Sequence, residues 1–295
     1  MNLFFQHAEK VFDWDELIQV ILILLACFTV PYLLVFIFSV KSKYIKAVKA
    51  YKRGDFYNAK SLLEKIKPSG PMYFHSRLFL SQLEMRAGKK DAAIQILREL
   101  IREHPEKYEP YQFISQVYLS MKANDICLDN ISKALDRNPP RRDRYALYVN
   151  MGTAYDSLRE YDKAIQSYLK AIEQIANDYL VYNNLGYAYL SQSKFSDAIT
   201  YFDKSMNLNP KFAFSYNNRG FAFANLGNFE KAFEDFKASL LLDSSNPYLY
   251  KFRGISFYKF GNFPEAKTNL EKALQMCTDF SDEISPILNE INKTH

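Results

Sequence analysis

A fixed spacing of 34 residues separates four glycines of this 295-residue chain: Gly152, Gly186, Gly220 and Gly254. Each glycine stands in a similar string, which reads YVNMGTAY, YNNLGYAY, YNNRGFAF and YKFRGISF in turn. The same period separates a row of small residues, Ala164, Ala198, Ala232 and Ala266, and a row of large ones, Tyr168, Phe202, Phe236 and Leu270. Self-similarity at this period indicates one supersecondary unit used repeatedly.

The spacing inside one unit predicts two helices that pack together. Tyr148, Met151 and Tyr155 recur every three or four residues and form one apolar stripe of a first helix. Gly152 in the same helix lets a second helix approach closely, and Ala164 and Tyr168 give that second helix its facing surface. The many aromatic residues, 22 Tyr and 24 Phe, are therefore expected to form core.

The pattern resembles the tetratricopeptide repeat, a helix-turn-helix unit of about 34 residues. Weaker copies precede the four clear ones, and an atypical first copy retains Gly54 and Ala59. The resemblance implies an all-α class, an α-solenoid of about seven repeats over 41–280, with a capping helix over 281–295. The predicted units start near residues 40, 74, 108, 145, 179, 213 and 247. Stacking of neighbours is required because no single unit can bury its apolar face.

Three extra residues interrupt the period around Pro139-Pro140-Arg141-Arg142-Asp143-Arg144. We expect an exposed loop that widens the joint between two units. Docking of an acidic partner on the arginines is the alternative to a merely solvated loop.

Residues 17–40 contain no charged residue and are predicted to form one transmembrane helix. The preceding residues 1–16 carry a net charge of −3, whereas residues 41–60 carry +6. Because Lys and Arg stay on the cytoplasmic side, we expect a single-pass protein with an extracytoplasmic N-terminal segment and cytoplasmic repeats, as in a bacterial inner membrane. A cleaved signal peptide fits less well, since the start is acidic, and lipidation at Cys27 is a minor alternative.

The remaining composition excludes several functions. With +5 for the whole chain, −3 before the apolar segment and +6 after it, residues 61–295 carry only +2, which disfavours nucleic acid as a partner. Three Cys and four His leave little material for a metal site. Phosphate-binding loops and hydrolase motifs are missing from the sequence, so we expect no cofactor, no metal and no enzyme activity.

The resemblance to tetratricopeptide repeats also implies where a partner binds, namely in a groove lined by the first helices. Asn150, Asn184 and Asn218 stand in register, 34 apart, and resemble an asparagine ladder that holds peptide backbone by side-chain amides. The predicted groove residues are Asn150, Asn183, Asn184, Tyr187, Asn217, Asn218, Phe221 and Lys251. The alternative is that these asparagines bond to neighbouring helices or to water.

The sequence thus predicts a membrane-anchored adaptor that binds a protein or an extended peptide, with residues 17–40 in the lipid bilayer. The alternative function is a structural or assembly component that uses its outer faces. That layout resembles lipopolysaccharide assembly protein B without the terminal metal module of its family.

Overall fold

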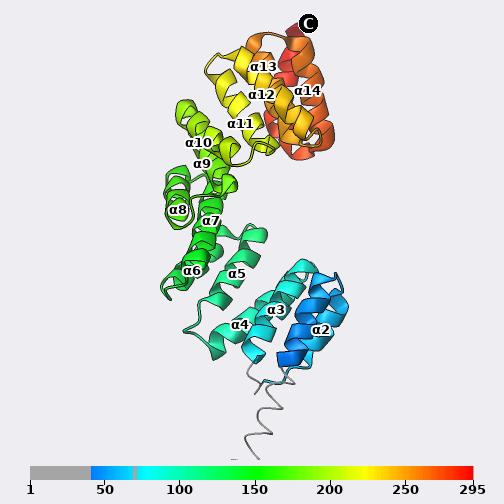
Figure 1. Ribbon diagram of the computed structural model, residues 1–295. Coiled ribbons are helices and arrows are strands. Elements are labelled where there is room, and N and C mark those ends of the chain that lie inside the picture. Colours follow the sequence, from blue (N-terminus) through cyan, green and yellow to red (C-terminus); the bar gives the residue numbers. More distant parts are fainter. Residues whose placement is uncertain (1–40, 69–71, 295) are drawn as a thin grey trace, which may run out of the picture. The chain divides into compact units, whose positions relative to one another are not determined.

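The computed structural model describes residues 41–68 and 72–294, and every regular element in those ranges is helical (Figure 1). The chain divides into two compact units, residues 1–105 and 106–295. The expectation of an all-helical repeat fold is confirmed. Within the described ranges, no helix combines the length and the apolar character needed to cross a bilayer. The predicted segments 1–16 and 17–40 lie outside those ranges.

The first unit contains two helix pairs. Residues 41–52 are helical and precede α2 (Phe56–Glu64), and α3 (Tyr73–Arg86) precedes α4 (Lys90–Glu103). Ala47, Ala59, Leu63 and Leu83 are buried together in one cluster, so the atypical first copy of the repeat packs on the second.

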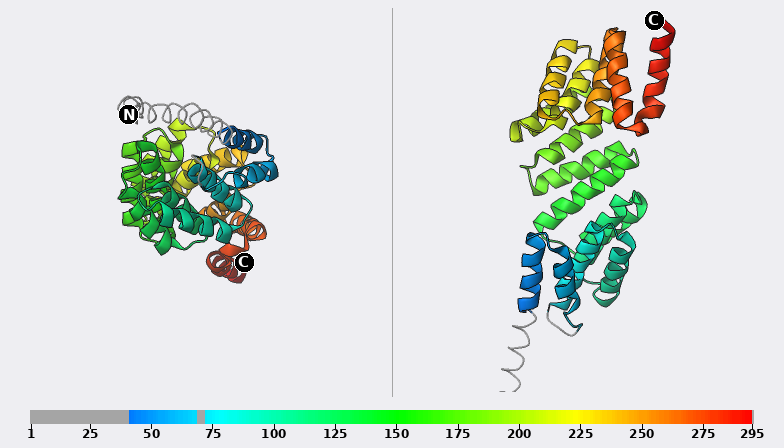
Figure 2. Two further views of the ribbon diagram at one scale, coloured as in Figure 1. Left: turned by 90° about the horizontal axis from the view of Figure 1, so that it is seen from below. Right: turned by 90° about the vertical axis from the view of Figure 1, so that its right-hand side faces the viewer.

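The second unit contains five more pairs, followed by a terminal helix. The pairs are α5 (Glu109–Ser120) with α6 (Asn124–Leu135), α7 (Arg141–Ser157) with α8 (Tyr161–Gln174), α9 (Tyr179–Ser191) with α10 (Phe195–Leu208), α11 (Ala213–Asn225) with α12 (Phe229–Leu242), and α13 (Pro247–Phe260) with α14 (Phe263–Met276). Successive helices lie side by side and alternate in direction (Figures 1 and 2). A short turn, η1 (Thr278–Phe280), leads to α15 (Ser281–Thr294), which buries Ile284 and Ile291.

A glycine on the first helix faces a large side chain on the second helix of each clear repeat. A Cβ atom at Gly152 would lie 2.5 Å from the ring of Tyr168, and one at Gly186 would lie 2.7 Å from the ring of Phe202. Since real Cβ atoms do not approach other atoms so closely, only glycine fits these two positions. The close approach predicted from the sequence is therefore present.

The turn between the two helices of a pair uses the left-handed backbone region. Gly227 has φ 78°, and the equivalent position in another repeat holds Ser193 with φ 58°. One residue later, the N–H of Asn228 donates to the carbonyl of Phe223 at 2.9 Å. This arrangement satisfies carbonyl groups at the helix end and reverses the chain within a few residues.

The predicted loop at residues 139–144 is wrong for most of its length, because α7 begins at Arg141. Pro140 lies just before the helix, with φ −55° and ψ 157°. Backbone N–H groups at the start of a helix have no partner within the helix, so the missing N–H of proline costs nothing there. Arg144 donates to the carbonyl of Pro139 at 3.0 Å, and Asp143 accepts from the hydroxyl of Tyr108 at 3.0 Å. The extra residues thus lengthen a helix instead of widening a joint.

Candidate partner-binding surface

The eight predicted groove residues all lie on first helices of the second unit. They are Asn150 on α7, Asn183, Asn184 and Tyr187 on α9, Asn217, Asn218 and Phe221 on α11, and Lys251 on α13. Their surroundings differ, because some pack between neighbouring helices and others remain open to solvent.

Asn183 and Asn218 bond to each other between neighbouring repeats. Both are buried, and Asn218 Nδ2 donates to Asn183 Oδ1 at 3.2 Å. The hydroxyl of Ser215 lies 3.2 Å from the same oxygen and 2.7 Å from Ser205 Oγ, so it can donate to either. These two amides join α9 to α11 and are not free for a partner.

Asn217 is fully buried, and neither atom of its amide has a hydrogen-bond partner among the described residues. It occupies the slot that Asn183 occupies one repeat earlier. Asn183 bonds to Ser215 and Asn218 of the repeat that follows it. The equivalent positions in the repeat that follows Asn217 hold Leu249 and Phe252. Neither side chain can accept or donate a hydrogen bond, which explains why this amide is unsatisfied.

The two asparagines should respond oppositely to the same substitution. We expect Asn217→Ala to stabilise the protein by about 1 kcal/mol, because it removes an unsatisfied buried amide, and Asn183→Ala to destabilise it by about 1 kcal/mol, because it leaves Asn218 without an acceptor. The urea midpoint of each full-length variant, followed by far-ultraviolet circular dichroism, measures both effects. Equal destabilisation by the two substitutions would contradict the difference in bonding.

Lys251 and Phe221 also join neighbouring helices. Lys251 Nζ lies 2.5 Å from Glu283 Oε2 on α15 and 4.7 Å from the ring centre of Phe280. Phe221 stacks on Phe252 of α13, with ring centroids 4.3 Å apart. Both side chains therefore have partners within the fold.

Three predicted residues remain open. Tyr187 is 38% exposed, and Asn150 and Asn184 are half-buried. Asn150 and Asn184 lie on consecutive first helices, α7 and α9. The asparagine ladder therefore stays a prediction for these two residues only.

An apolar row that sequence reasoning missed lies near the starts of three first helices. Leu180, Phe214 and Tyr248 are 44%, 39% and 41% exposed, on α9, α11 and α13. They are spaced 34 apart, so the signal was present in the period. The predicted groove positions all follow the first aromatic of each string, whereas this row lies two residues before it.

The hydroxyl of Tyr187 is influenced by titratable groups on several other helices. Burial raises the pKa of Tyr187, and the electrostatic influence of Tyr248, Asp156, Tyr161 and Glu283 raises it further. Those groups come from α13, α7, α8 and α15, respectively. Groups that are distant in sequence therefore act electrostatically on one hydroxyl.

Asp156 is a poorly compensated carboxylate. The hydroxyl of Tyr168 donates to its Oδ2 at 3.1 Å, while Oδ1 is buried and has no donor among the residues that the structure describes. Burial raises the pKa of Asp156 to about 6, although the hydrogen bond from Tyr168 opposes that effect. A carboxylate held in this way disfavours the folded state near neutral pH.

The pH dependence of stability should report this carboxylate. The carboxyl of Asp156 holds its proton more tightly in the folded state than in the unfolded state. Its contribution to the free energy of unfolding is therefore most favourable below about pH 4 and is lost as pH rises to about 6. We therefore expect Asp156→Asn to gain about 2 kcal/mol of stability relative to the native chain between pH 4 and pH 7. Urea unfolding of both proteins at a series of pH values measures this difference in stability.

The exposed Glu173 on α8 supplies the control for that experiment. Glu173→Gln should change the urea midpoint only slightly, because this side chain is exposed. A stability difference between Asp156→Asn and the native chain that stays constant with pH would contradict the assignment.

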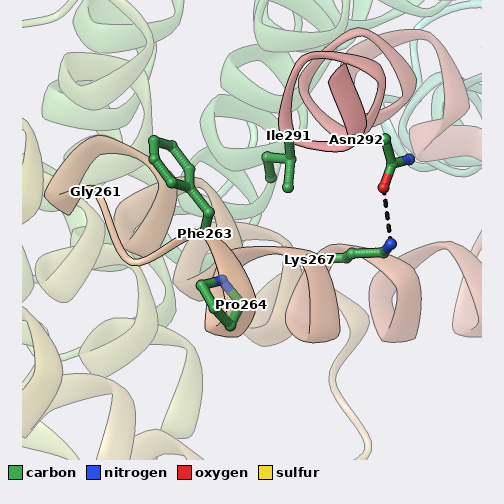
Figure 3. Close-up of a pocket in the computed structure, with 6 residues that line it drawn as sticks. All are labelled: Gly261, Phe263, Pro264, Lys267, Ile291 and Asn292. Atoms are coloured by element: carbon green, nitrogen blue, oxygen red, sulfur yellow. Dashed lines mark hydrogen bonds between the residues drawn. The ribbon is translucent and has the colours of Figure 1, made fainter. Parts of the chain in front are cut away.

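A cavity of about 600 Å³ lies between the start of α14 and the end of α15 (Figure 3). It is lined by Gly261, Phe263, Pro264, Lys267, Ile291 and Asn292. Lys267 donates to Asn292 Oδ1 at 2.7 Å, so the charged group of this cavity already has a partner. None of the predicted groove residues lines it.

The Cys127 thiol and the potential metal ligands are two places to look for chemical reactivity. Burial raises the pKa of the Cys127 thiol to about 11, which keeps it protonated and unreactive. In the ranges 41–68 and 72–294, no group of three or more His, Cys, Asp and Glu side chains is placed to hold a metal ion. The arrangement offers binding surfaces.

Comparison with family models gives four matches, each to a tetratricopeptide repeat. The matched segments are residues 80–107, 145–178, 179–212 and 213–246. No curated protein matches the chain.

Several solved structures share the fold. A tetratricopeptide repeat protein from Parabacteroides merdae ATCC 43184 has a TM-score of 0.65 and 18% identity, covering 86% of this chain and 98% of its own. The protein pilF of Pseudomonas aeruginosa has a TM-score of 0.60 and 16% identity, covering 75% and 97%. MamA from Desulfovibrio magneticus RS-1 has a TM-score of 0.54 and 19% identity, covering 59% and 96%. At these identities the likeness concerns the fold.

Proposed function

We propose that this chain, a tetratricopeptide repeat protein, is a non-enzymatic adaptor that binds a protein or an extended peptide on the inner side of residues 145–294. The observation that carries the proposal is the exposed apolar row of Leu180, Phe214 and Tyr248, which lies in register on three successive first helices. Exposed apolar side chains arranged in this way favour contact with another chain. Tyr187, Asn150 and Asn184 offer further contacts beside the row.

A second candidate function is permanent assembly through outer faces. A different exposed row favours it: Leu208, Leu242 and Met276, at the ends of three second helices, are 44%, 42% and 38% exposed. The two rows therefore compete as partner-binding surfaces.

Site-specific photo-crosslinking separates the two functions. We expect benzoylphenylalanine at position 187 to form adducts with a partner protein in living cells, and the same probe at position 242 to form none. Tyr187 and Leu242 have similar exposure, so accessibility is matched. A variant with Leu180, Phe214 and Tyr248 all changed to Ser should lose the adduct at position 187. Adducts at position 242 alone would support assembly through the outer face instead.

We also propose that residues 17–40 tether the repeats to a bilayer, with the repeats on the cytoplasmic side. The uncharged run and the change from −3 to +6 across it support this topology. The basic residues that follow, among them Lys41 and Lys43, would then lie beside anionic headgroups.

The tether predicts that the full-length chain stays in the membrane pellet after alkaline carbonate extraction. A chain without residues 17–40 should become extractable, because it lacks the apolar segment. Of two reporters fused after residue 60, the one that works only in the cytoplasm should be active, and the one that works only outside the cytoplasm should be inactive. A full-length product that carbonate releases would contradict the proposal.

A further inference from the structure

A basic cavity of about 310 Å³ lies in the first helix pair, between helix 41–52 and α2. Its lining includes Lys46, Lys49 and Arg53, from helix 41–52 and the turn after it, and Asp55, Asn58 and Leu62, from α2 and its N-cap. The predicted groove residues all belong to the second unit, so this cavity is a separate candidate site in the first.

Three cations of the basic cavity lack a counter-charge. Lys46, Lys49 and Arg53 are spaced three and four residues apart, which brings them to the same side of the helix and its last turn. All three are exposed, and none of them forms an ion pair with another described residue, whereas Lys60 on α2 pairs with Glu84 at 2.6 Å. Because like charges at this spacing repel each other, a bound anion would stabilise the arrangement.

The carboxylate in the lining does not cancel these charges. Asp55 caps α2, and its Oδ1 accepts from the backbone N–H of Asn58 at 3.0 Å. The positive end of the helix dipole at that position already offsets part of its charge. Three cations against one carboxylate leave the cavity positive. A phosphate group suits it, since its oxygens accept charge-assisted hydrogen bonds from Lys and Arg.

Exposed apolar side chains adjoin the basic cavity in the sequence. Tyr57 precedes Asn58 and is 88% exposed, and Ile45 precedes Lys46 and is 43% exposed. Leu62, in the lining itself, is half-buried. Tyrosine is enriched at the level of lipid headgroups, where its ring meets apolar groups and its hydroxyl meets water. Cations combined with exposed apolar side chains are typical of a protein surface that meets a bilayer.

The place of the cavity in the chain favours a lipid over other anions. Helix 41–52 follows directly on the uncharged residues 17–40. At about 1.5 Å per residue, only about 20 Å of helix separates Arg53 from the end of that uncharged run. A tether at residues 17–40 therefore holds the cavity near the headgroups at a high effective concentration. Acidic proteins and nucleic acid would have to reach it from solution.

We propose that the basic cavity binds the phosphate of an anionic phospholipid in the bilayer. Lys46, Lys49 and Arg53 donate to the phosphate oxygens, and Tyr57 enters the headgroup region. Helix 41–52 then lies along the membrane surface. The proposal rests on the tether put forward under the proposed function, and it adds the class of lipid that the first unit selects.

The test uses the full-length chain in vesicles of phosphatidylcholine and phosphatidylglycerol in equal amounts. Trp14→Phe removes the single tryptophan of the chain, and Tyr57→Trp places a tryptophan next to the cavity. Bromine on an acyl chain near the headgroup quenches tryptophan fluorescence on contact, and it is attached to one of the two lipids at a time. We expect about twofold stronger quenching by brominated phosphatidylglycerol, because the cations concentrate anionic lipid around position 57.

Variants of the cavity complete the test. Lys46→Gln, Lys49→Gln and Arg53→Gln, introduced together, should make the quenching by the two lipids equal. The three side chains are exposed, so the fold should be retained, which far-ultraviolet circular dichroism checks. The matched control loses the same charge at three exposed lysines of the first unit outside the cavity lining, through Lys65→Gln, Lys67→Gln and Lys89→Gln. It should retain the preference.

Three results would overturn the lipid site. They are equal quenching by the two lipids in the chain with the native cavity, a preference that survives the loss of the three cavity cations, and a preference that the control variant loses as well. Inorganic phosphate that removes the preference, at an ionic strength where sodium chloride leaves it unchanged, would also overturn it, because the cavity would then bind a free phosphate.

Carbonate extraction of the same vesicles keeps the tether separate from the lipid site. A chain that resists extraction but shows equal quenching leaves the tether standing without the lipid site. A chain that carbonate releases overturns the tether, and the lipid site with it.

Discussion

The contact between a glycine of one helix and a large side chain of the next holds each clear repeat together. Where the ring of Tyr168 lies against Gly152, and that of Phe202 against Gly186, a Cβ atom has no room. The second helix therefore lies directly on the backbone of the first, and the fully buried Ala164 and Ala198 complete the fit. Because every pair of this kind has similar geometry, pairs stack in the same way and place their first helices on a common side.

The elements that depend on this local contact could be predicted from the sequence. Gly152 and Tyr168 are near each other in the chain, so their period alone indicates two packed helices and a turn between them. The prediction failed at residues 139–144 because two prolines and a break in the period were interpreted as a loop. Proline is compatible with the position before a helix, and arginine favours helix, so α7 simply starts earlier.

The candidate binding surface could be predicted only in part, because the role of a slot depends on the residues one repeat further along. Asn183 and Asn217 are the same residue type at the same slot. One meets the amide of Asn218 and is satisfied, whereas the other meets apolar side chains and is not. A pattern within one repeat contains no information on such a junction. The groups that raise the pKa of Tyr187 are harder still to predict, since they come from α7, α8, α13 and α15.

Two polar groups, Asn217 and Asp156, both oppose folding, but they do so in different ways. Asn217 is fully enclosed by the fold, so no partner can reach it without opening the junction between α11 and α13. Asp156 opposes folding only when it is charged, since burial raises its pKa to about 6, so its cost grows as pH rises. The stability supplied by the glycine contacts of several repeats makes such a cost tolerable at one position. An unsatisfied polar group in this fold is therefore no sign of a binding site by itself, and the exposed positions of the first helices are the better guide to where a partner binds.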